Sequence, residues 1–422
     1  MFRITFTPLI FRTAALKNNQ FWEHHADGLA LQGYLGRKIG FWFHFTNEGE
    51  SGAQLDTSRQ FTPDPGEIIL KSKIKENRFS YDNIRAGISY NWQWGDLIIA
   101  KDQLLWGTGR SGRIVLSAKP PAFPFFQLDV KPAKWLNFHY VHGWLNSDVI
   151  DSNRTYSTGL KDNQRVVYRE KYYAMHSVTF FPWRGIDFSV GESIIYADRL
   201  KFAYLQPIMF FRPADHYLSS KAGNNAGDNA QIFMSARLRN MLPGTFVYGT
   251  LLIDEINTNK MFSKQHRNQI AFQVGGSVTD FPFDNLSLDL EYVRLNPFVY
   301  RHYIPTQTYE NSGFVLGHWI GHNADLIYSA VRYQPLRGLR VKIWQHTIRK
   351  GENGTPSQQY TVPQPPFLFG RVTKQFQWGV KLEYQWLYEL SGVVEYRHLR
   401  NSQDGVAWSK ADQFYLTIRY GI

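Results

Sequence analysis

Cysteine is absent from the 422 residues, and so is any apolar run long enough to form a membrane-spanning helix. The first absence excludes disulfides and thiolate chemistry. The second excludes a helical membrane span, which needs about 18 or more consecutive apolar residues. A chain that crosses a membrane without such helices must close a β-sheet on itself, because lipid offers no partner to unpaired backbone groups.

Aromatic residues are abundant, at 16% of the chain, yet the mean hydropathy is only −0.38 because polar residues are interleaved with the large apolar ones. The formal charge of +12 favours anionic partners such as acidic glycans or lipid phosphates. Nucleic acid is the rival anionic partner. The sequence has no lysine-rich helix and no known reader motif, so we expect no nucleic-acid binding.

Strict alternation of apolar and polar residues is the strongest signal for strands. In the segment 376–386 (FQWGVKLEYQW), the large apolar residues share one parity and the polar residues share the other. The segments 269–274, 286–292 and 413–422 repeat this pattern. A period of two places one set of side chains on each face of a strand. Alternating segments of roughly ten residues are typical of outer-membrane barrels.

Eight short breaks, most of them containing proline or glycine, interrupt the alternating segments. These residues fix or permit the dihedral angles of a tight reversal, so we predict a hairpin at each break. The breaks are Gly36–Lys38, Trp94–Asp96, Lys131–Lys134, Pro182–Gly185, Leu242–Gly244, Pro282–Asn285, Pro335–Gly338 and Glu389–Ser391. With an opening strand at Phe2–Phe11 and a closing strand at Gln413–Ile422, the eight hairpins predict about eighteen antiparallel strands.

Longer polar connections separate the hairpins, at 47–80, 146–170, 198–228, 296–323 and 350–371. Outer-membrane barrels have short periplasmic turns and long extracellular loops, so the pattern predicts both termini in the periplasm and these connections outside the cell. Trp94, Trp135 and Trp183 lie at short turns, where an aromatic girdle is expected. Soluble β-sandwiches or a propeller would also alternate, but would not usually carry aromatic residues at hairpin ends.

We therefore predict an all-β protein with a single domain, residues 1–422, in the bacterial outer membrane. Its expected surroundings are outer-membrane lipid and lipopolysaccharide. Met1–Ile10 begins directly in alternating sequence, without the basic, apolar and small-residue regions of a signal peptide. We expect a signal peptide, and any periplasmic segment, to lie upstream of this numbering.

The segment Gly107–Gly112 (GTGRSG) matches the G-x-G-x-x-G pattern of dinucleotide sites, which requires a helix directly after it. Residues 113–116 are strand-like, and Pro120, Pro121 and Pro124 follow them. A helix is excluded there, so we interpret the glycines as loop residues and expect no bound cofactor. The spacing of acidic, serine and histidine residues specifies no catalytic triad or carboxylate pair, and we expect no enzyme activity.

Four histidines are candidate metal ligands. His139 and His142 are three residues apart on a predicted strand, so they point to opposite faces. His318 and His322 share a loop with Asp325 and could converge on a metal. The preferred interpretation is that they are solvated loop histidines and bind no metal.

Glu192 conflicts with the alternation around it. It shares parity with Ile186, Phe188 and Val190, which would turn its carboxylate toward lipid at a high energetic cost. A bulge near Gly191 or a position above the hydrocarbon would resolve the conflict, and a functional role is the alternative.

Basic residues recur on the predicted inner face of the barrel, for example Arg340, Lys342, Lys381 and Arg419. Asp289, Glu291 and Glu383 could balance their charge in a solvated lumen. The other interpretation is an interior that attracts anions.

Two regions resemble the capsule assembly Wzi family of outer-membrane proteins. They are Lys101–Pro124, with the pattern W-G-x-G-x-x-G-x-[IVL]-x-[IVL]-S, and Gly191–Asn229, with GESIIYADR, YLQP and GDN. The resemblance implies an eighteen-stranded barrel that helps to attach capsular polysaccharide to the cell surface, in a lectin-like role and without enzyme activity. The residues that match the family pattern are Trp106, Gly107, Gly109, Gly112, Ser117, Glu192, Tyr196, Pro207, Asp228 and Asn229.

Aromatic and basic residues cluster in the same two regions and are the candidates for glycan binding. They are Trp106, Arg110, Arg113, Arg199, Lys201, Tyr204, Arg212 and Tyr217. Two other functions remain open. One is an oligosaccharide or anion-selective porin, and the other is a barrel subunit of a larger complex with outer-membrane proteins as partners.

Overall fold

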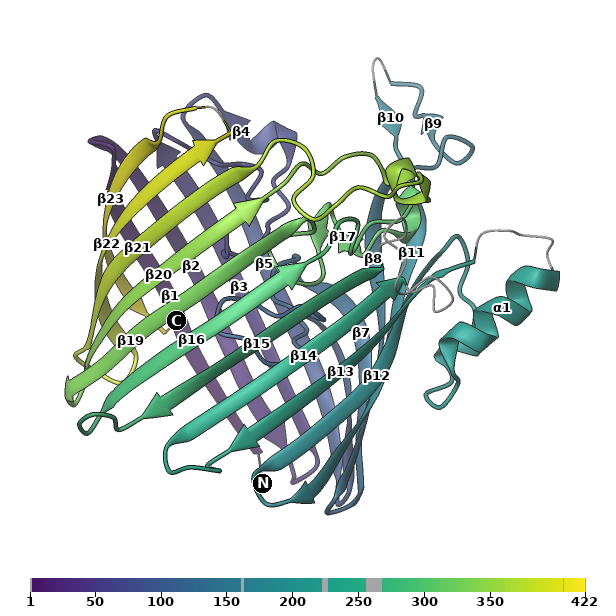
Figure 1. Ribbon diagram of the computed structural model, residues 1–422, viewed down its shortest axis with the longest axis horizontal. Helices are drawn as coiled ribbons and strands as arrows, with labels where there is room; N and C mark the ends of the chain where they lie inside the picture. The colour runs from purple at the N-terminus through teal and green to yellow at the C-terminus, as the bar shows by residue number, and fades with distance from the viewer. Residues whose placement is uncertain (1, 161–162, 222–226, 256–267, 405, 422) are drawn as a thin grey trace.

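Eighteen antiparallel strands close into one barrel in the computed structural model, which describes residues 2–160, 163–221, 227–255, 268–404 and 406–421 (Figure 1). The first strand, β1 (Phe2–Lys17), pairs with the last, β23 (Ser409–Tyr420), and this pairing closes the wall. The intervening wall strands are β2 (Gln20–Leu35), β3 (Ile39–Gly52), β5 (Arg78–Trp92), β6 (Gly95–Asp102), β7 (Phe123–Ala133), β8 (Leu136–Ile150), β11 (Tyr168–Trp183), β12 (Ile186–Ala197), β13 (Asn229–Arg239), β14 (Thr245–Glu255), β15 (Gln269–Thr279), β16 (Leu286–Leu295), β19 (Ala324–Leu336), β20 (Leu339–Lys350), β21 (Thr373–Gln385) and β22 (Leu390–Gln403). The predicted fold class and strand number are confirmed.

Short elements decorate the connections. They are β4 (Ile74–Lys75), β9 (Tyr156–Ser157), β10 (Gln164–Arg165), β17 (Glu310–Asn311), β18 (Phe314–Val315), the 3-10 helices η1 (Lys71–Lys73), η2 (Phe202–Leu205), η4 (Pro305–Gln307) and η5 (Pro356–Tyr360), and the helix α1 (Phe211–Lys221). Within the described ranges, no helix has the length and apolar character that a membrane span requires.

All eight predicted hairpins are present, each joining two neighbouring wall strands. Gly36 and Gly338 adopt φ values of 63° and 87° in two of these turns, a region that favours glycine. A further hairpin at Asn18 and Asn19, which was not predicted, joins β1 to β2 at the opposite end of the barrel. Their φ values of 51° and 64° match the tight turn type that asparagine tolerates. The opening strand consequently extends past Phe11.

Both termini lie at the short-turn end. Phe2 is paired with Leu35, next to one short turn, and Tyr420 is paired with Leu390, next to another. The tryptophans predicted to form a girdle, Trp94, Trp135 and Trp183, are all exposed beside these turns.

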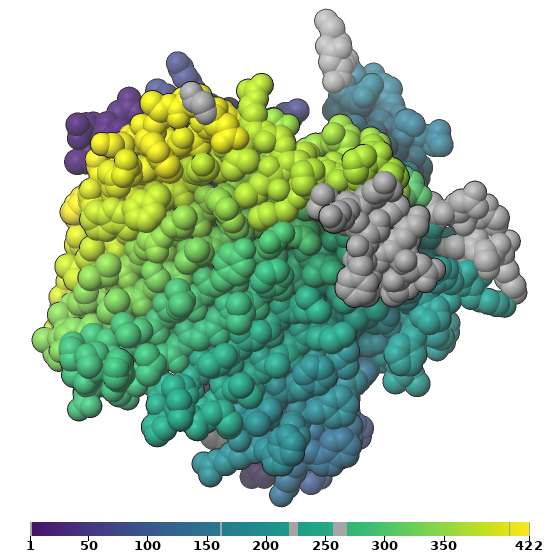
Figure 2. Space-filling view, in the orientation of Figure 1, coloured from purple at the N-terminus to yellow at the C-terminus, as the bar shows by residue number. Residues whose placement is uncertain are grey.

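The wall alternates as predicted, with polar side chains inside and apolar side chains outside. On β16, Asp289 and Glu291 are buried on the inner face, while Leu290 between them is 62% exposed on the outer face. Figure 2 views this outer wall, which in an outer-membrane barrel faces lipid.

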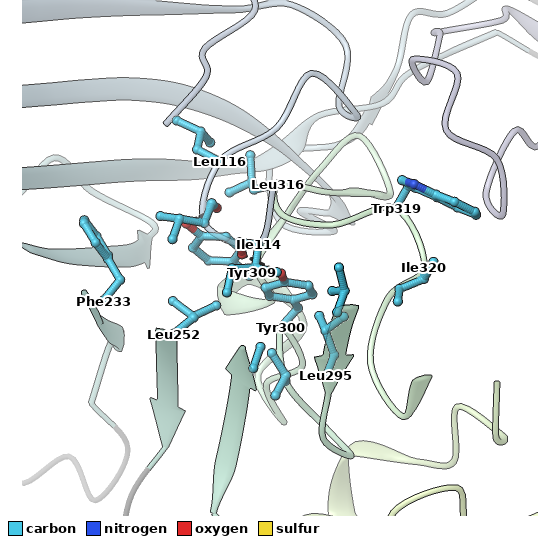
Figure 3. Packing of buried hydrophobic residues seen from close by; sticks show 14 of the residues in the cluster. Ile114, Leu116, Phe233, Leu252, Leu295, Tyr300, Tyr309, Leu316, Trp319 and Ile320 are labelled. Carbon is cyan, nitrogen blue, oxygen red and sulfur yellow. Dashed lines mark hydrogen bonds between the residues drawn. The ribbon is translucent and has the colours of Figure 1, made fainter. Parts of the chain in front are cut away.

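The main hydrophobic core lies inside the barrel rather than within the wall itself. Ile114 and Leu316, from two loops that fold inward, pack against Phe233, Leu252 and Leu295 of the wall (Figure 3). Protein therefore fills part of the barrel interior beside strands β13–β16.

Candidate functional site: three inner loops and an outer flap

Three connections fold toward the barrel interior and lock together. We call 53–77, 103–122 and 296–323 the inner loops. Lys119 joins two of them, because its buried ammonium group donates hydrogen bonds to the carbonyl oxygens of Arg59, Thr62 (3.0 Å) and Asp64 (2.8 Å). Desolvation lowers the pKa of Lys119 to about 8. The third loop joins through Trp319, whose ring lies 5.6 Å from that of Phe61.

Glu291 of β16 anchors the inner loop 103–122 to the wall. Its carboxylate accepts hydrogen bonds from the backbone N–H groups of Arg110 (2.7 Å) and Ser111 (2.9 Å), and from the hydroxyl groups of Ser111 and Tyr248. Hydrogen bonds to a buried charged acceptor are stronger than neutral ones. The Arg110 guanidinium also pairs with Asp289 at 3.1 Å. The loop is therefore fixed by two acidic residues on the inner face.

The glycines of the GTGRSG segment allow neighbouring atoms to pack more closely than a side chain would permit. A Cβ atom at Gly109 would lie 1.7 Å from the carbonyl oxygen of Gly112, and one at Gly112 would lie 2.7 Å from the His318 ring. Gly107 has a φ of 95°. No helix follows the segment, so the interpretation of these glycines as loop residues is confirmed.

Trp106 and Ser117 secure the two ends of the same motif. The Trp106 indole N–H donates to Ser177 Oγ at 3.1 Å, and its ring centroid lies 4.4 Å from that of Phe233. The Ser117 hydroxyl donates to the Gly317 carbonyl at 2.5 Å, which joins the loop to 296–323. These family-pattern residues hold the loop in place.

The interpretation of His318 and His322 as solvated is wrong, because both side chains are buried. His318 Nε2 lies 3.2 Å from Ser111 Oγ, and His322 Nδ1 accepts the Phe298 N–H at 3.1 Å. Burial lowers the pKa of His318 to about 3 and that of His322 well below its ordinary value. Asp325, the third residue considered, accepts hydrogen bonds from Arg349 instead. On strand β8, the predicted opposite orientations of His139 and His142 are confirmed, because the first pairs with Asp129 and the second with Tyr196.

The second motif-bearing region forms a flap on the outer wall. We call residues 198–228 the outer flap; it includes η2 and α1, and Figure 1 shows α1 beside β12 and outside the barrel. Tyr204 and Phe211 of the flap are fully buried against outward-facing residues of β8, β11 and β12. The Tyr140 hydroxyl of β8 donates to the Tyr204 carbonyl at 2.7 Å.

The two motif-bearing connections leave the wall at the long-loop end, where the extracellular loops were predicted. The connection 103–122 folds inside, and the outer flap folds down the outside. Both do so because their apolar side chains, such as Ile114 and Phe211, are buried against the wall instead of remaining in water.

The flap resolves the conflict at Glu192. The pairing of β12 with β11 and β13 is regular through Glu192, so no bulge turns the side chain inward. The carboxylate points out of the barrel, where it accepts the Phe211 N–H at 2.6 Å and lies 3.2 Å from His176 Nε2. The bulge suggested by the sequence is therefore wrong, and the flap buries the carboxylate instead.

The structure divides the glycan-binding candidates between two places that the barrel wall separates. Trp106, Arg110 and Arg113 belong to an inner loop, and the others belong to the outer flap. Within the flap, Lys201 forms an ion pair with Asp228, and the Tyr204 hydroxyl donates to the same carboxylate at 2.8 Å. Glycan binding by these residues stays a prediction.

Three further family-pattern residues connect the flap to its neighbours. The Tyr196 hydroxyl lies 2.7 Å from His142 Nε2 beneath the flap. Pro207 lies between η2 and α1. At the end of the flap, Asn229 Nδ2 donates to the Gln307 carbonyl at 2.9 Å and so ties the start of β13 to the inner loop 296–323.

The cations of the inner wall face the lumen while their acidic partners are buried. In three ion pairs the arginine side chain is 40–59% exposed and the acid is 1–13% exposed; the pairs are Arg239 with Asp187, Arg332 with Asp289 and Arg340 with Glu383. The lumen therefore presents a positively charged surface along these strands. Alternation predicted the inner-face position of Arg340 correctly, but it could not predict which partner of each pair would be exposed.

Aromatic residues also gather at the long-loop end, where no such cluster was predicted. The rings of Tyr303 and Tyr360 are 5.7 Å apart, and His302 lies 4.7 Å from Tyr303. Elsewhere on the rim, the Arg400 guanidinium lies 5.5 Å from the Trp408 ring. Tyr303, Tyr360 and Trp408 are all exposed.

Comparisons with known proteins bear on the fold. No family model matches the chain, and no curated protein matches it. Among solved structures, Wzi of Escherichia coli, described as a carbohydrate-binding β-barrel involved in group 1 capsule assembly, is 12% identical with a TM-score of 0.58, over 98% of this chain and 85% of Wzi. OccK8 of Pseudomonas aeruginosa is 10% identical with a TM-score of 0.53, and OccAB2 of Acinetobacter baumannii is 11% identical with a TM-score of 0.52; each match covers 99% of this chain and 97% of the other. The chain therefore has the fold of an outer-membrane β-barrel, shared with Wzi and with the Occ barrels.

Proposed function

We propose that the protein binds a surface polysaccharide at the long-loop end of an outer-membrane barrel and so takes part in attaching or assembling it at the cell surface. The observation that carries the proposal is a set of exposed aromatic rings there, one of them beside a guanidinium group. Tyr303 and Tyr360 lie together next to the His302 ring, and Trp408 lies beside Arg400. Aromatic rings offer apolar faces to sugar rings, and arginine pairs with the carboxylates of acidic sugars.

The inner loops support attachment over free passage. Lys119 and Trp319 join the three loops, and Glu291 fixes one of them to the wall. A glycan bound at the rim would therefore meet packed protein below it along part of the lumen. The description of Wzi as a carbohydrate-binding barrel is consistent with this role for a chain of the same fold.

Replacing the aromatic groups tests the proposal. We expect the variant with Tyr303→Ala, Tyr360→Ala and Trp408→Ala to lose binding of a purified uronic-acid polysaccharide, measured by isothermal titration calorimetry in detergent. Tyr388→Ala is the matched control, because Tyr388 is 93% exposed but follows β21 in a short turn at the other end of the barrel. Equal binding by both variants and the unaltered protein would contradict the proposal.

An anion-selective porin is the second candidate, favoured by the exposed guanidinium groups of Arg239, Arg332 and Arg340 in the lumen. Recordings in planar bilayers separate the two functions. Large, stable, anion-selective currents from the unaltered protein would favour the porin, and a barrel that stays closed would favour attachment. A role as the barrel subunit of a larger complex predicts stable copurification with other outer-membrane proteins.

A further inference from the structure

The outer flap exposes a set of large apolar side chains. They are Leu200 (46% exposed), Phe202 (74%), Ile208 (82%), Phe210 (70%) and Leu218 (37%). Exposed apolar patches mark sites that meet another apolar surface. Figure 1 shows α1 of the flap outside the wall, on the right of the view.

The flap lies beside a part of the wall that is expected to face lipid. The flap covers Glu192, which lies six residues after Ile186, the first residue of β12 at the short turn. This spacing corresponds to roughly 20 Å along the strand. The apolar band of an outer-membrane barrel is about 25 Å tall and its strands are tilted, so Glu192 falls within the band. Phe188 on the same outward row of β12 is exposed.

Part of the backbone of the flap is hydrogen-bonded within the protein, which lowers the cost of a position near lipid. The Tyr204 N–H donates to Lys201 at 3.1 Å, and the Met209 N–H donates to Gln206 at 3.1 Å. The Phe211 N–H at the start of α1 donates to Glu192. Pro207 and Pro213 have no N–H to satisfy.

We propose that the outer flap is a membrane anchor that lies at the boundary between the acyl chains and the headgroups of the outer leaflet. Phe202, Ile208 and Phe210 insert among the acyl chains, in the manner of an interfacial amphipathic segment. The flap thereby continues the lipid-facing surface of β12 and seals the polar pair of His176 and Glu192 from lipid. The occupant of the exposed face is membrane lipid, and this role is independent of glycan binding.

Nitroxide labelling tests the anchor directly, because the chain contains no cysteine and each label site is unique. Ile208→Cys probes the flap. Leu290→Cys reports the lipid-facing wall, where Leu290 is 62% exposed, and Tyr156→Cys reports a rim hairpin, where Tyr156 is 61% exposed. The labelled proteins are reconstituted in vesicles of phosphatidylcholine and phosphatidylglycerol. Folding of each is verified by its heat-dependent migration in electrophoresis.

Collision of the label with oxygen, which dissolves in lipid, is compared with collision with a water-soluble nickel chelate. We expect the label at Ile208 to match the one at Leu290, with high access to oxygen and loss of access to nickel. A label at Ile208 that behaves like the one at Tyr156 would place the face in water and overturn the proposal. Exclusion of both reagents would place it against a second protein, which also overturns it. Phe202→Cys gives an independent site if the Ile208 variant does not fold.

Discussion

At the scale of single residues, buried carboxylates on both faces of the wall organise the connections around it. Glu291 faces the interior and Glu192 faces outward, and each accepts a backbone N–H from a connection that packs on its own side. A buried carboxylate is stable only when such donors surround it. The same residue type therefore fixes an inner loop and an outer flap.

Replacement of Glu291 tests the first of these anchors. We expect Glu291→Ala to lower the free energy of unfolding by about 3 kcal/mol, because several hydrogen bonds to a charged acceptor are lost and the donors stay buried. Denaturant unfolding in detergent, followed by tryptophan fluorescence, measures the change. Asp27→Ala is the control; it breaks an exposed ion pair with Arg12, which we expect to contribute less than about 1 kcal/mol. Equal effects of the two substitutions would contradict the anchoring role.

The sequence predicted the position of each anchoring carboxylate on its strand, but not the groups that bond to it. Alternation placed Glu291 on the inner face and showed that Glu192 was out of place on the outer one, since parity within a strand is a local property. The partners could not be predicted, because Arg110 is 181 residues away from Glu291 in the chain. Hydrogen bonds over such separations depend on how the whole barrel closes.

At the scale of elements, the positions of most turns were predictable from the sequence, but the directions of the long loops were not. Glycine and proline set local dihedral angles, so hairpins such as those at Gly36 and Gly338 were predictable. The hairpin at Asn18 and Asn19 lacks both residue types and was missed. Loop direction depends on which wall residues the loop can cover, as Phe211 does on the outside, and periodicity carries no information beyond the end of a strand.

The flap itself gives a prediction at this scale. We expect Glu192→Ala to release the outer flap and raise the rate of trypsin cleavage after Arg199 and Lys201, because the Phe211 N–H loses its acceptor. The cleavage sites are identified by mass spectrometry of the fragments. Glu192→Gln keeps an acceptor oxygen at the same position and should cleave more slowly than the alanine variant. If trypsin cleaves the alanine and glutamine variants equally fast, the carboxylate does not hold the flap.

At the scale of the whole molecule, the fold class followed from what the sequence lacks together with its alternation. The absence of a spanning helix left a closed sheet, and the eight hairpins supplied its strand number. The function does not follow in the same way. Barrels of this fold differ in what their loops and lumen do, and both Wzi and the Occ barrels share the fold.

The lumen and its loops together determine whether ions pass. Lys119 holds two inner loops by donating to three carbonyl oxygens, and methionine at this position would lose these bonds while keeping a similar length. We therefore expect Lys119→Met to raise the single-channel conductance in planar bilayers above that of the unaltered protein. The current should favour anions, because Arg239, Arg332 and Arg340 face the lumen more than their acidic partners do.

Neutralising those three arginines tests the origin of the selectivity. Adding Arg239→Gln, Arg332→Gln and Arg340→Gln to Lys119→Met should move the reversal potential in a potassium chloride gradient toward that of a cation-selective pore, because three positive charges are removed from the lumen while Asp187, Asp289 and Glu383 keep their negative charges. Adding Arg12→Gln instead is the matched control, since Arg12 pairs with Asp27 on the outer face and should leave the reversal potential unchanged. A cation-selective current from Lys119→Met alone would show that the exposed guanidinium groups do not set the field along the pore, and the anionic partner inferred from the net charge would then have to bind elsewhere on the barrel.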